Sequence, residues 1–148
     1  MIKNIKVEEI LEASNSTELF NLYFNEGSRG LLPSLDINKP IFYALDSAGL
    51  LDCFGVYHLD TLVGFVIAST SVMPHYNCLG TTIMSIYIHK DHRKFGVSKQ
   101  LLMLVEHCAT NRGSKAILLS SPIDSKFGKF STTLGFKKTN EFYGKALI

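Results

Sequence analysis

The chain has 148 residues, 46% of them hydrophobic and 19% charged, and its formal net charge is +2. Length and composition predict a single globular domain over residues 1–148, and they exclude a disordered or fibrous protein. The small net charge argues against nucleic acid as a partner, and no apolar run reaches the ~18 residues that a membrane span requires.

The N-terminal third of the chain predicts one strand and two helical segments. Apolar residues favour a short strand over residues 2–7. Asn15 and Glu18 have the spacing of a capping box, and the apolar residues that follow predict a helix over residues 15–24. Glycine and proline residues end this helix, and a helical turn is expected over residues 41–45.

The middle of the chain predicts three strands and a helix. Residues 51–58 and 61–69 are rich in β-branched and aromatic side chains, and the short polar link between them predicts an antiparallel hairpin. Residues 74–77 break this pattern, and the next strand is expected over residues 81–89. Apolar residues at helical spacing then predict a helix over residues 97–109.

A strand, a helix and a hairpin are expected in the last third of the chain. Four consecutive apolar residues indicate a buried strand within residues 115–120, and a helix should follow over residues 125–134. Residues 136–138 and 141–147 are expected to form a closing hairpin around Asn140. The strand–helix–strand crossover in the middle requires a parallel pair. The order of elements therefore predicts an α/β (α+β) fold, with a mixed, mainly antiparallel central sheet flanked by helices.

The junction between the fourth predicted strand and the helix after it carries the pattern Arg93-x-x-Gly96-x-Ser98. A strand that passes into a helix through a small-residue turn leaves several backbone N–H groups directed at one spot, and the helix dipole adds partial positive charge there. The junction is therefore a predicted phosphate site. Basic residues surround it at Lys90, Lys94 and Lys99. The alternative is that Gly96 only begins the helix and that the lysines form a solvated surface.

This pattern resembles the corresponding turn of the GNAT superfamily of N-acetyltransferases, which has Gln or Arg, two residues, Gly, one residue and then Gly or Ala. Arg93 and Gly96 match, and Ser98 stands in for the last small residue. The hairpin with Leu62-Val63-Gly64-Phe65 is similar to the family's central hairpin. Leu134-Gly135-Phe136 is similar to its ending before the last strands.

The resemblance covers residues 40–148, and the first forty residues are ambiguous. Two shorter matches, Pro74-His75-Tyr76 and Phe142-Tyr143-x-Lys145, resemble a little-characterised subset of these enzymes that bacteriophages carry. The N-terminus is charged and shows no secretory leader, so a cytoplasmic protein is expected, in the host cytoplasm if a phage encodes it. The three cysteines have no paired spacing, which agrees with a reducing compartment.

The resemblance implies acetyl-CoA (coenzyme A) as co-substrate and no metal. Acetyl-CoA would lie in the V between a splayed fourth and fifth strand, with its pyrophosphate on main-chain N–H groups of residues 93–98. The backbone N–H of Ile86 or Ile88 would stabilise the oxyanion that forms during transfer. The residues expected to bind the co-substrate are Ile86, Tyr87, Ile88, Arg93, Lys94, Phe95, Gly96, Val97, Ser98, Lys99 and Asp124.

Three positions depart from the family's pattern. The family commonly has a Glu on the fourth strand, a Tyr in the helix before Leu-Gly-Phe and an Asn after the fifth strand; Met84, Ser131 and Asp124 stand there in this chain. His75 and Tyr76, on the loop that enters the fourth strand, are candidate catalytic replacements, because an imidazole can take a proton near neutral pH. Ser131 is a candidate donor to the CoA sulfur. The alternative is that His75 caps a turn and that Tyr76 packs its ring.

Two functions therefore stay open. The first is an acetyl-CoA-dependent N-acetyltransferase in which a primary amine attacks directly within a ternary complex; the acceptor is a small-molecule or protein amine. The second is a catalytically impaired acyl-CoA-binding or protein-interaction module of the same fold. Neither nucleic acid nor a membrane is expected as a partner, and a homodimer is left open.

Overall fold

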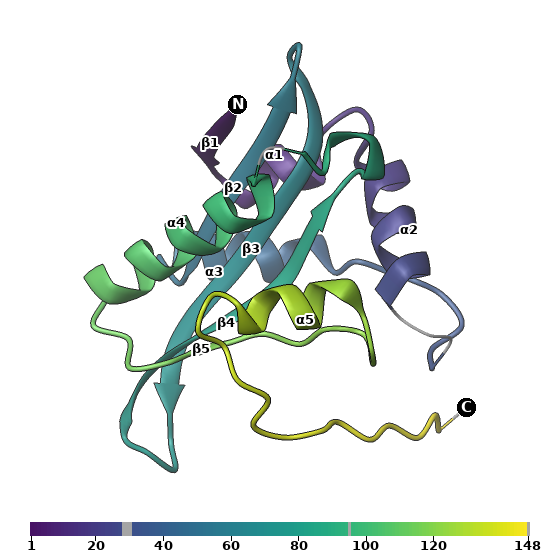
Figure 1. The fold of residues 1–148 in the computed structure, drawn as a ribbon. Coiled ribbons are helices and arrows are strands. Elements are labelled where there is room, and N and C mark those ends of the chain that lie inside the picture. Colours follow the sequence, from purple (N-terminus) through teal and green to yellow (C-terminus); the bar gives the residue numbers. More distant parts are fainter. Residues whose placement is uncertain (28–30, 95, 148) are drawn as a thin grey trace.

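The computed structural model describes residues 1–27, 31–94 and 96–147. Its elements follow one another as β1 (Ile2–Ile5), α1 (Val7–Leu11), α2 (Ser16–Gly27), α3 (Lys39–Ser47), β2 (Leu51–His58), β3 (Thr61–Met73), β4 (Cys78–Ile88), the 3-10 turn η1 (Lys90–His92), α4 (Val97–Asn111), β5 (Ile117–Leu118) and α5 (Lys126–Thr132). The strands form one sheet in the order β1-β2-β3-β4-β5, with α1 to α3 behind it and α4 and α5 in front in the view of Figure 1.

The pairing of the strands confirms the predicted mixed sheet. β1, β2, β3 and β4 are antiparallel neighbours, and β4 and β5 are parallel. The predicted hairpin is β2–β3, and the predicted crossover runs from β4 through α4 to β5. The fold is therefore the α/β class expected from the order of elements.

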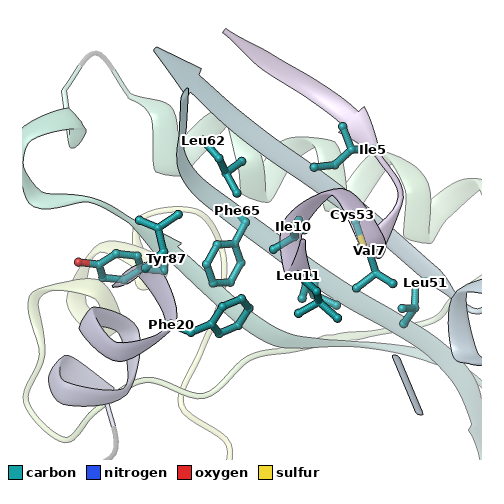
Figure 2. Packing of buried hydrophobic residues seen from close by; sticks show 12 residues of the cluster. Ile5, Val7, Ile10, Leu11, Phe20, Leu51, Cys53, Leu62, Phe65 and Tyr87 are labelled. Carbon is teal, nitrogen blue, oxygen red and sulfur yellow. The ribbon is translucent and has the colours of Figure 1, made fainter. Parts of the chain in front are cut away.

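One face of the sheet packs against α1, α2 and α3, and Figure 2 shows the buried side chains between them. Phe20 of α2 stacks on Phe65 of β3, with ring centroids 4.7 Å apart. Tyr87 of β4 belongs to the same cluster and is buried. Because Phe65 has no exposed surface, α2 is held firmly over β3 and β4.

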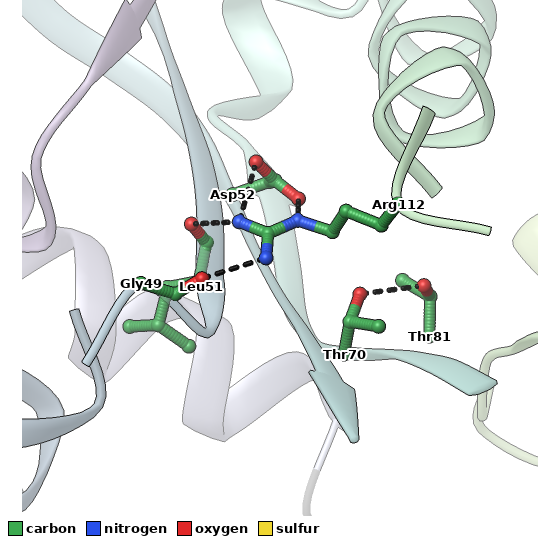
Figure 3. A network of polar contacts seen from close by, with 6 residues as sticks. All are labelled: Gly49, Leu51, Asp52, Thr70, Thr81 and Arg112. Atoms are coloured by element: carbon green, nitrogen blue, oxygen red, sulfur yellow. Dashed lines mark hydrogen bonds and ion pairs between the residues drawn. The ribbon is translucent and has the colours of Figure 1, made fainter. Parts of the chain in front are cut away.

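The other face of the sheet packs against α4 and α5. Leu101, Leu102, Val105 and Ala109 are the buried residues of α4, and their spacing is that of one helix face. At the far end of this helix, Arg112 donates from Nε to Oδ2 of Asp52 over 2.6 Å and from Nη1 to the carbonyl of Gly49 over 2.6 Å (Figure 3). These contacts fix the C-terminal end of α4 to the start of β2.

Two N-terminal features differ from the sequence prediction. The expected strand over residues 2–7 ends at Ile5, and the short helix α1, which was not predicted, begins at Val7. The N–H of Val7 donates to Asp46 Oδ2 of α3 over 2.8 Å. A helix of five residues depends on such a tertiary contact, which no local pattern reveals.

The strands around the middle of the sheet differ from prediction in length. β3 continues to Met73 and β4 begins at Cys78, so this hairpin is longer than expected. β5 contains only Ile117 and Leu118, although residues 115–120 were predicted to form a strand. A strand lasts only as long as its neighbour supplies hydrogen bonds, and β4 supplies them to two residues of β5.

The predicted C-terminal hairpin is wrong: residues 136–147 form no strand. Phe142, Tyr143 and Leu147 are more than four-fifths exposed, and the segment runs below the rest of the molecule in Figure 1. An ion pair of 2.7 Å joins Lys138 to Glu141 within the segment. Apolar side chains favour a strand only where a sheet edge and a covering face receive them, and the two-residue β5 offers little of either.

Candidate functional site

The edge of β4 that faces β5 is closed at its start and open at its end. Thr81 pairs with Ile117 and Thr82 with Leu118, and the N–H of Thr81 donates to the carbonyl of Ala116 over 2.9 Å. From Ile83 to Ile88 no described strand lies along this edge. This is the splayed pair of strands expected from the family resemblance.

A β-bulge separates the two halves of β4. Ile83 pairs with Ala68 and Ser85 with Ile67, so Met84 between them is the extra residue without a partner across β3. After a bulge, the residues whose backbone N–H groups face a given neighbouring strand are shifted by one position. Met84 is 39% exposed. The family resemblance implies that this is the position where a carboxylate commonly stands.

Because of the bulge, the N–H groups of Ile86 and Ile88 point to the open edge. The N–H of His89 donates to the carbonyl of Val63 in the β3 ladder over 2.8 Å. In an antiparallel ladder every second residue makes such bonds, so Tyr87 faces β3 and the two isoleucines face away. Of the three β4 residues expected to bind the co-substrate, Ile86 and Ile88 can therefore offer their N–H groups, whereas that of Tyr87 is directed into the sheet.

The N-terminus of α4 supplies further N–H groups. Gly96 caps the helix in the left-handed conformation, with φ 71° and ψ 25°, and no side chain caps it. The first helical bond runs from the N–H of Gln100 to the carbonyl of Gly96 over 3.0 Å. The N–H groups of the first turn, those of Val97, Ser98 and Lys99, thus have no acceptor within the helix.

The space beside this helix end is open. A Cβ atom built on Gly96 would meet no atom within 4 Å, and Lys94 and Lys99 are exposed. The combination of unbonded N–H groups, the positive end of a helix dipole and open space is what an anion requires. Phe95, which was expected to belong to this turn, lies outside the described residues.

The side chain of Arg93 does not extend freely into this space. Its Nε donates to the carbonyl of Ile88 over 2.7 Å, and its Nη2 to Oε2 of Glu26 over 2.6 Å. Tyr87 Oη donates to the other oxygen of Glu26 over 3.2 Å. Burial, followed by the charge of Glu26, raises the pKa of Tyr87. Glu26 was not predicted as a site residue, and a contact between residues 67 positions apart leaves no local signal in the sequence.

His75 and Tyr76 lie at the opposite end of β4 from the predicted phosphate site at residues 93–98, which is called the anion turn below. They form the β3–β4 turn, where the N–H of Tyr76 donates to the carbonyl of Met73 over 3.1 Å, and both side chains are exposed. The 11 residues of β4 separate them from η1, which at about 3.3 Å per residue is roughly 35 Å along the strand. The structure therefore does not bring these two candidates together with the turn, and their catalytic role stays a prediction.

Ser131 and Asp124 lie at either end of the α5 region. Ser131 is 3% exposed, and its Oγ donates to the carbonyl of Phe127 over 2.8 Å, so its proton is already engaged within α5. Asp124 is exposed, with φ 57°, a conformation that Asp tolerates better than most residues. It directly precedes Ser125, whose Oγ accepts from the N–H of Gly128 and caps α5.

Other site types find little support in the described part of the chain. Among residues 1–27, 31–94 and 96–147, no group of three or more His, Cys, Asp and Glu side chains is arranged to hold a metal ion. None of the helices described is both long enough and apolar enough to cross a membrane. Cys53 is buried in the first core, and this burial raises the pKa of its thiol to about 12.

Comparisons with known proteins agree with this geometry. The sequence model of the Acetyltransferase (GNAT) family matches residues 10–125. The class defined by the fold and the open β4 edge is thus an acetyltransferase, and the chain belongs to the GNAT family. No curated protein sequence matches the chain.

Several solved structures share the fold. A predicted acetyltransferase with acetyl-CoA from Clostridium acetobutylicum is 18% identical, with a TM-score of 0.75 over 99% of this chain and 96% of that one. An aminoglycoside N-acetyltransferase in complex with CoA is 19% identical, with a TM-score of 0.67 over 99% of each chain. Ribosomal-protein-alanine N-acetyltransferase from Brucella melitensis biovar Abortus 2308 is 18% identical, with a TM-score of 0.66 over 100% of this chain and 98% of that one. The narrower likeness to phage enzymes stays a prediction.

Proposed function

We propose that this protein transfers the acetyl group of acetyl-CoA to a primary amine. The observation that carries the proposal is the set of backbone N–H groups without an acceptor at the end of β4 and at the start of α4. There the N–H groups of Ile86 and Ile88 face the open edge, and those of the first turn of α4 have no helical acceptor. Relatives of the same fold that hold CoA or acetyl-CoA support the choice of ligand.

Each part of acetyl-CoA would find a matching group in this region. Its pyrophosphate would accept from the N–H groups of Val97, Ser98 and Lys99, and Gly96 leaves room for it to approach the backbone. The thioester would lie along Ile86 and Ile88, whose N–H groups can stabilise a negative oxygen. Asp124 would border the same V from the α5 side.

Transfer then requires few groups of the protein. The amine nitrogen attacks the thioester carbon, so that the C–N bond forms and the C–S bond breaks. The proton that the amine loses passes to solvent, and the departing thiolate takes a proton from solvent. Met84 cannot take a proton, and the Ser131 hydroxyl is bonded to Phe127. Catalysis would therefore depend mainly on holding the reactants together and on the N–H groups of β4.

Direct attack, without an acyl-enzyme, is supported by the positions of the three cysteines. Cys78 begins β4 and so lies at the end of that strand opposite to Ile86 and Ile88. Cys53 is buried in the first core, with its thiol pKa raised to about 12. Burial also raises the pKa of Cys108, which lies on α4. The thiolate is the nucleophilic form of cysteine, so neither residue is suited to accept the acetyl group.

The second candidate, a binding module that has lost transfer, is favoured by the same two residues, Met84 and Ser131. Turnover separates the two functions. The protein is mixed with acetyl-CoA and a thiol reagent, and CoA release is followed with an amino-acid amide, a peptide with a free N-terminus, a lysine peptide, a polyamine and an aminoglycoside. Release that depends on one of these amines supports the transferase. Binding of acetyl-CoA without release for any amine supports the module.

A matched pair of variants tests the shared ligand site. Gly96→Glu places a carboxylate at the start of α4, and Gly113→Glu places one at its end; both glycines have positive φ and open space around them. The backbone strain is therefore similar in the two variants. Gly96→Glu should weaken acetyl-CoA binding at least about thirtyfold by calorimetry, because like charges would meet there. If both variants bind as the wild type does, the anion turn is not the ligand site.

A further inference from the structure

We propose that Glu26 is a positioning residue for the anion turn, which it serves by holding the guanidinium of Arg93 over the carbonyl of Ile88. The inference rests on the proposed function, because it concerns how the same turn receives acetyl-CoA. Glu26 lies near the end of α2, outside the strand–turn–helix segment that contains the turn. It would act through Arg93 and would not touch the ligand.

Glu26, Arg93, Tyr87 and Ile88 are joined by hydrogen bonds in which each named polar atom has one partner. One carboxylate oxygen of Glu26 accepts from Arg93 Nη2 at 2.6 Å, and the other accepts from Tyr87 Oη at 3.2 Å. Arg93 Nε donates to the Ile88 carbonyl at 2.7 Å, and the guanidinium carbon lies 5.4 Å from the centre of the Tyr87 ring. The guanidinium is thus held from three directions, by Glu26, Tyr87 and Ile88.

The position of Glu26 follows from how α2 docks on the sheet. Phe20, Tyr23 and Glu26 recur every three residues and share one face of the helix. Tyr23 packs edge-on against Tyr87, with centroids 6.5 Å apart, and Phe20 stacks on Phe65. Figure 2 shows the hydroxyl end of Tyr87 directed toward α2. This aromatic packing fixes where the carboxylate stands, so it presents a preorganised acceptor to Arg93.

The electrostatic reason concerns the Ile88 carbonyl. This oxygen lies on the open edge of β4, next to the N–H groups that would receive the phosphates and the thioester. A bare carbonyl oxygen there would repel an approaching anion, whereas an arginine bonded to it replaces partial negative charge by positive charge. Without the charge of Glu26, Arg93 would lose one of its three contacts and would cover the carbonyl less of the time.

The alternative to positioning is competition between Glu26 and the ligand for Arg93, and the two roles change acetyl-CoA affinity in opposite directions. If Glu26 only competed with the phosphates for Arg93, removing its charge would tighten binding. If Glu26 positions Arg93, removing its charge weakens binding. Both side chains are almost half exposed, with fractions of 42% for Arg93 and 46% for Glu26, so the coupling is that of a surface ion pair.

The test uses Glu26→Gln, which keeps the size of the side chain and can still accept from Tyr87. Glu12→Gln is the matched control, because Glu12 forms a similarly exposed ion pair, with Lys39 at 3.0 Å, and likewise accepts from a tyrosine hydroxyl, that of Tyr43. Acetyl-CoA affinity is measured by calorimetry for both variants. We expect Kd to rise roughly two- to fivefold for Glu26→Gln and to stay unchanged for Glu12→Gln.

A double-variant cycle identifies the route of the effect. In an Arg93→Ala background, Glu26→Gln should cause no further loss of affinity, and with a turnover assay KM for acetyl-CoA should rise while kcat changes little. A tighter Kd for Glu26→Gln, an unchanged Kd, or an equal loss in the Arg93→Ala background would each overturn the proposal. If wild-type protein gives no heat with acetyl-CoA, the proposed function itself fails, which is a different result.

Discussion

The two halves of β4 differ in what their backbone can do, although they belong to one strand. In the first half, Thr81 and Thr82 have neighbours on both sides, and the hydroxyls of Thr70 and Thr81 meet at 2.7 Å in a buried contact (Figure 3). In the second half, Ile86 and Ile88 have β3 on one side and no described strand on the other. The first half stabilises the sheet, and the second leaves N–H groups available.

The bulge at Met84 marks the boundary between the two halves, and it shows how backbone geometry can form a site without special side chains. Met84 at the bulge changes which N–H groups face the open edge, and β5 ends before it reaches them. Isoleucines provide these groups, so the chemistry lies in the backbone and its direction, not in the side chains. If this division is right, substitutions in the first half should change stability, and substitutions in the second should change binding or turnover.

The largest effect is expected in the closed half. Thr81→Val removes one member of the buried hydroxyl pair and leaves Thr70 without its partner. The free energy of unfolding, measured with urea, should fall by about 2 kcal/mol, because an unsatisfied buried polar group carries most of its desolvation cost. Affinity for acetyl-CoA should not change in the folded variant.

The double variant Thr70→Val/Thr81→Val is the control for this contact. Removing both hydroxyls leaves no unpaired group, so most of the lost stability should return. A double variant that is less stable than Thr81→Val would show that the hydroxyls matter for packing and not for their mutual bond. A large loss of acetyl-CoA affinity in either variant would contradict the division of β4 into two halves.

The next effect is expected at the bulge itself. Met84→Glu restores a carboxylate at the position where the GNAT pattern commonly has one, and Met84 is exposed enough to accept the charge. With the amine that is acetylated fastest, kcat near neutral pH should rise about tenfold, since a general base assists attack by the amine. Met103→Glu, on the exposed side of α4, is the matched control and should leave kcat unchanged. No rise for Met84→Glu would mean that a missing base does not limit this enzyme.

A smaller effect is expected from the charge of Asp124. Asp124→Asn removes a negative charge from the proposed border of the V between β4 and β5, and Asp60→Asn makes the same change in the β2–β3 turn. Both residues have positive φ, which Asn also tolerates. Affinity for acetyl-CoA should improve about twofold for the first variant and stay constant for the second, as expected for an exposed charge near an anion. Equal effects in the two variants would indicate a change in net charge alone.

Sequence patterns predicted the parts of the molecule that local chemistry determines. The hairpin β2–β3 followed from β-branched residues on both sides of a polar link, and α4 followed from apolar residues at helical spacing that begin after Gly96. The uncapped start of α4 followed from the same glycine, and its role as an anion turn stays a prediction. In each case the residues that define the element are neighbours in the chain, so their pattern contains the information.

The remaining features depend on contacts between distant residues. α1 forms where the Val7 N–H meets Asp46, and Arg93 is held by Glu26 from another helix. The bulge at Met84 has no glycine or proline to signal it. The sequence allowed a catalytic role for the Ser131 hydroxyl. Only the structure shows that this hydroxyl donates its proton to the carbonyl of Phe127 within α5.

The smallest effect is expected in the C-terminal segment, where prediction and structure disagree most. If residues 136–147 lie outside the sheet, Phe142 buries little surface, and Phe142→Ser should change the free energy of unfolding by less than about 0.5 kcal/mol. If the segment formed the hairpin expected from its apolar residues, Phe142 would be packed and its loss would cost about 3 kcal/mol. Urea unfolding of this variant, beside Phe65→Ala as the buried reference, distinguishes the two arrangements, because Phe65 has no exposed surface. A loss near that of the reference would restore the predicted hairpin and place a further strand beside β5.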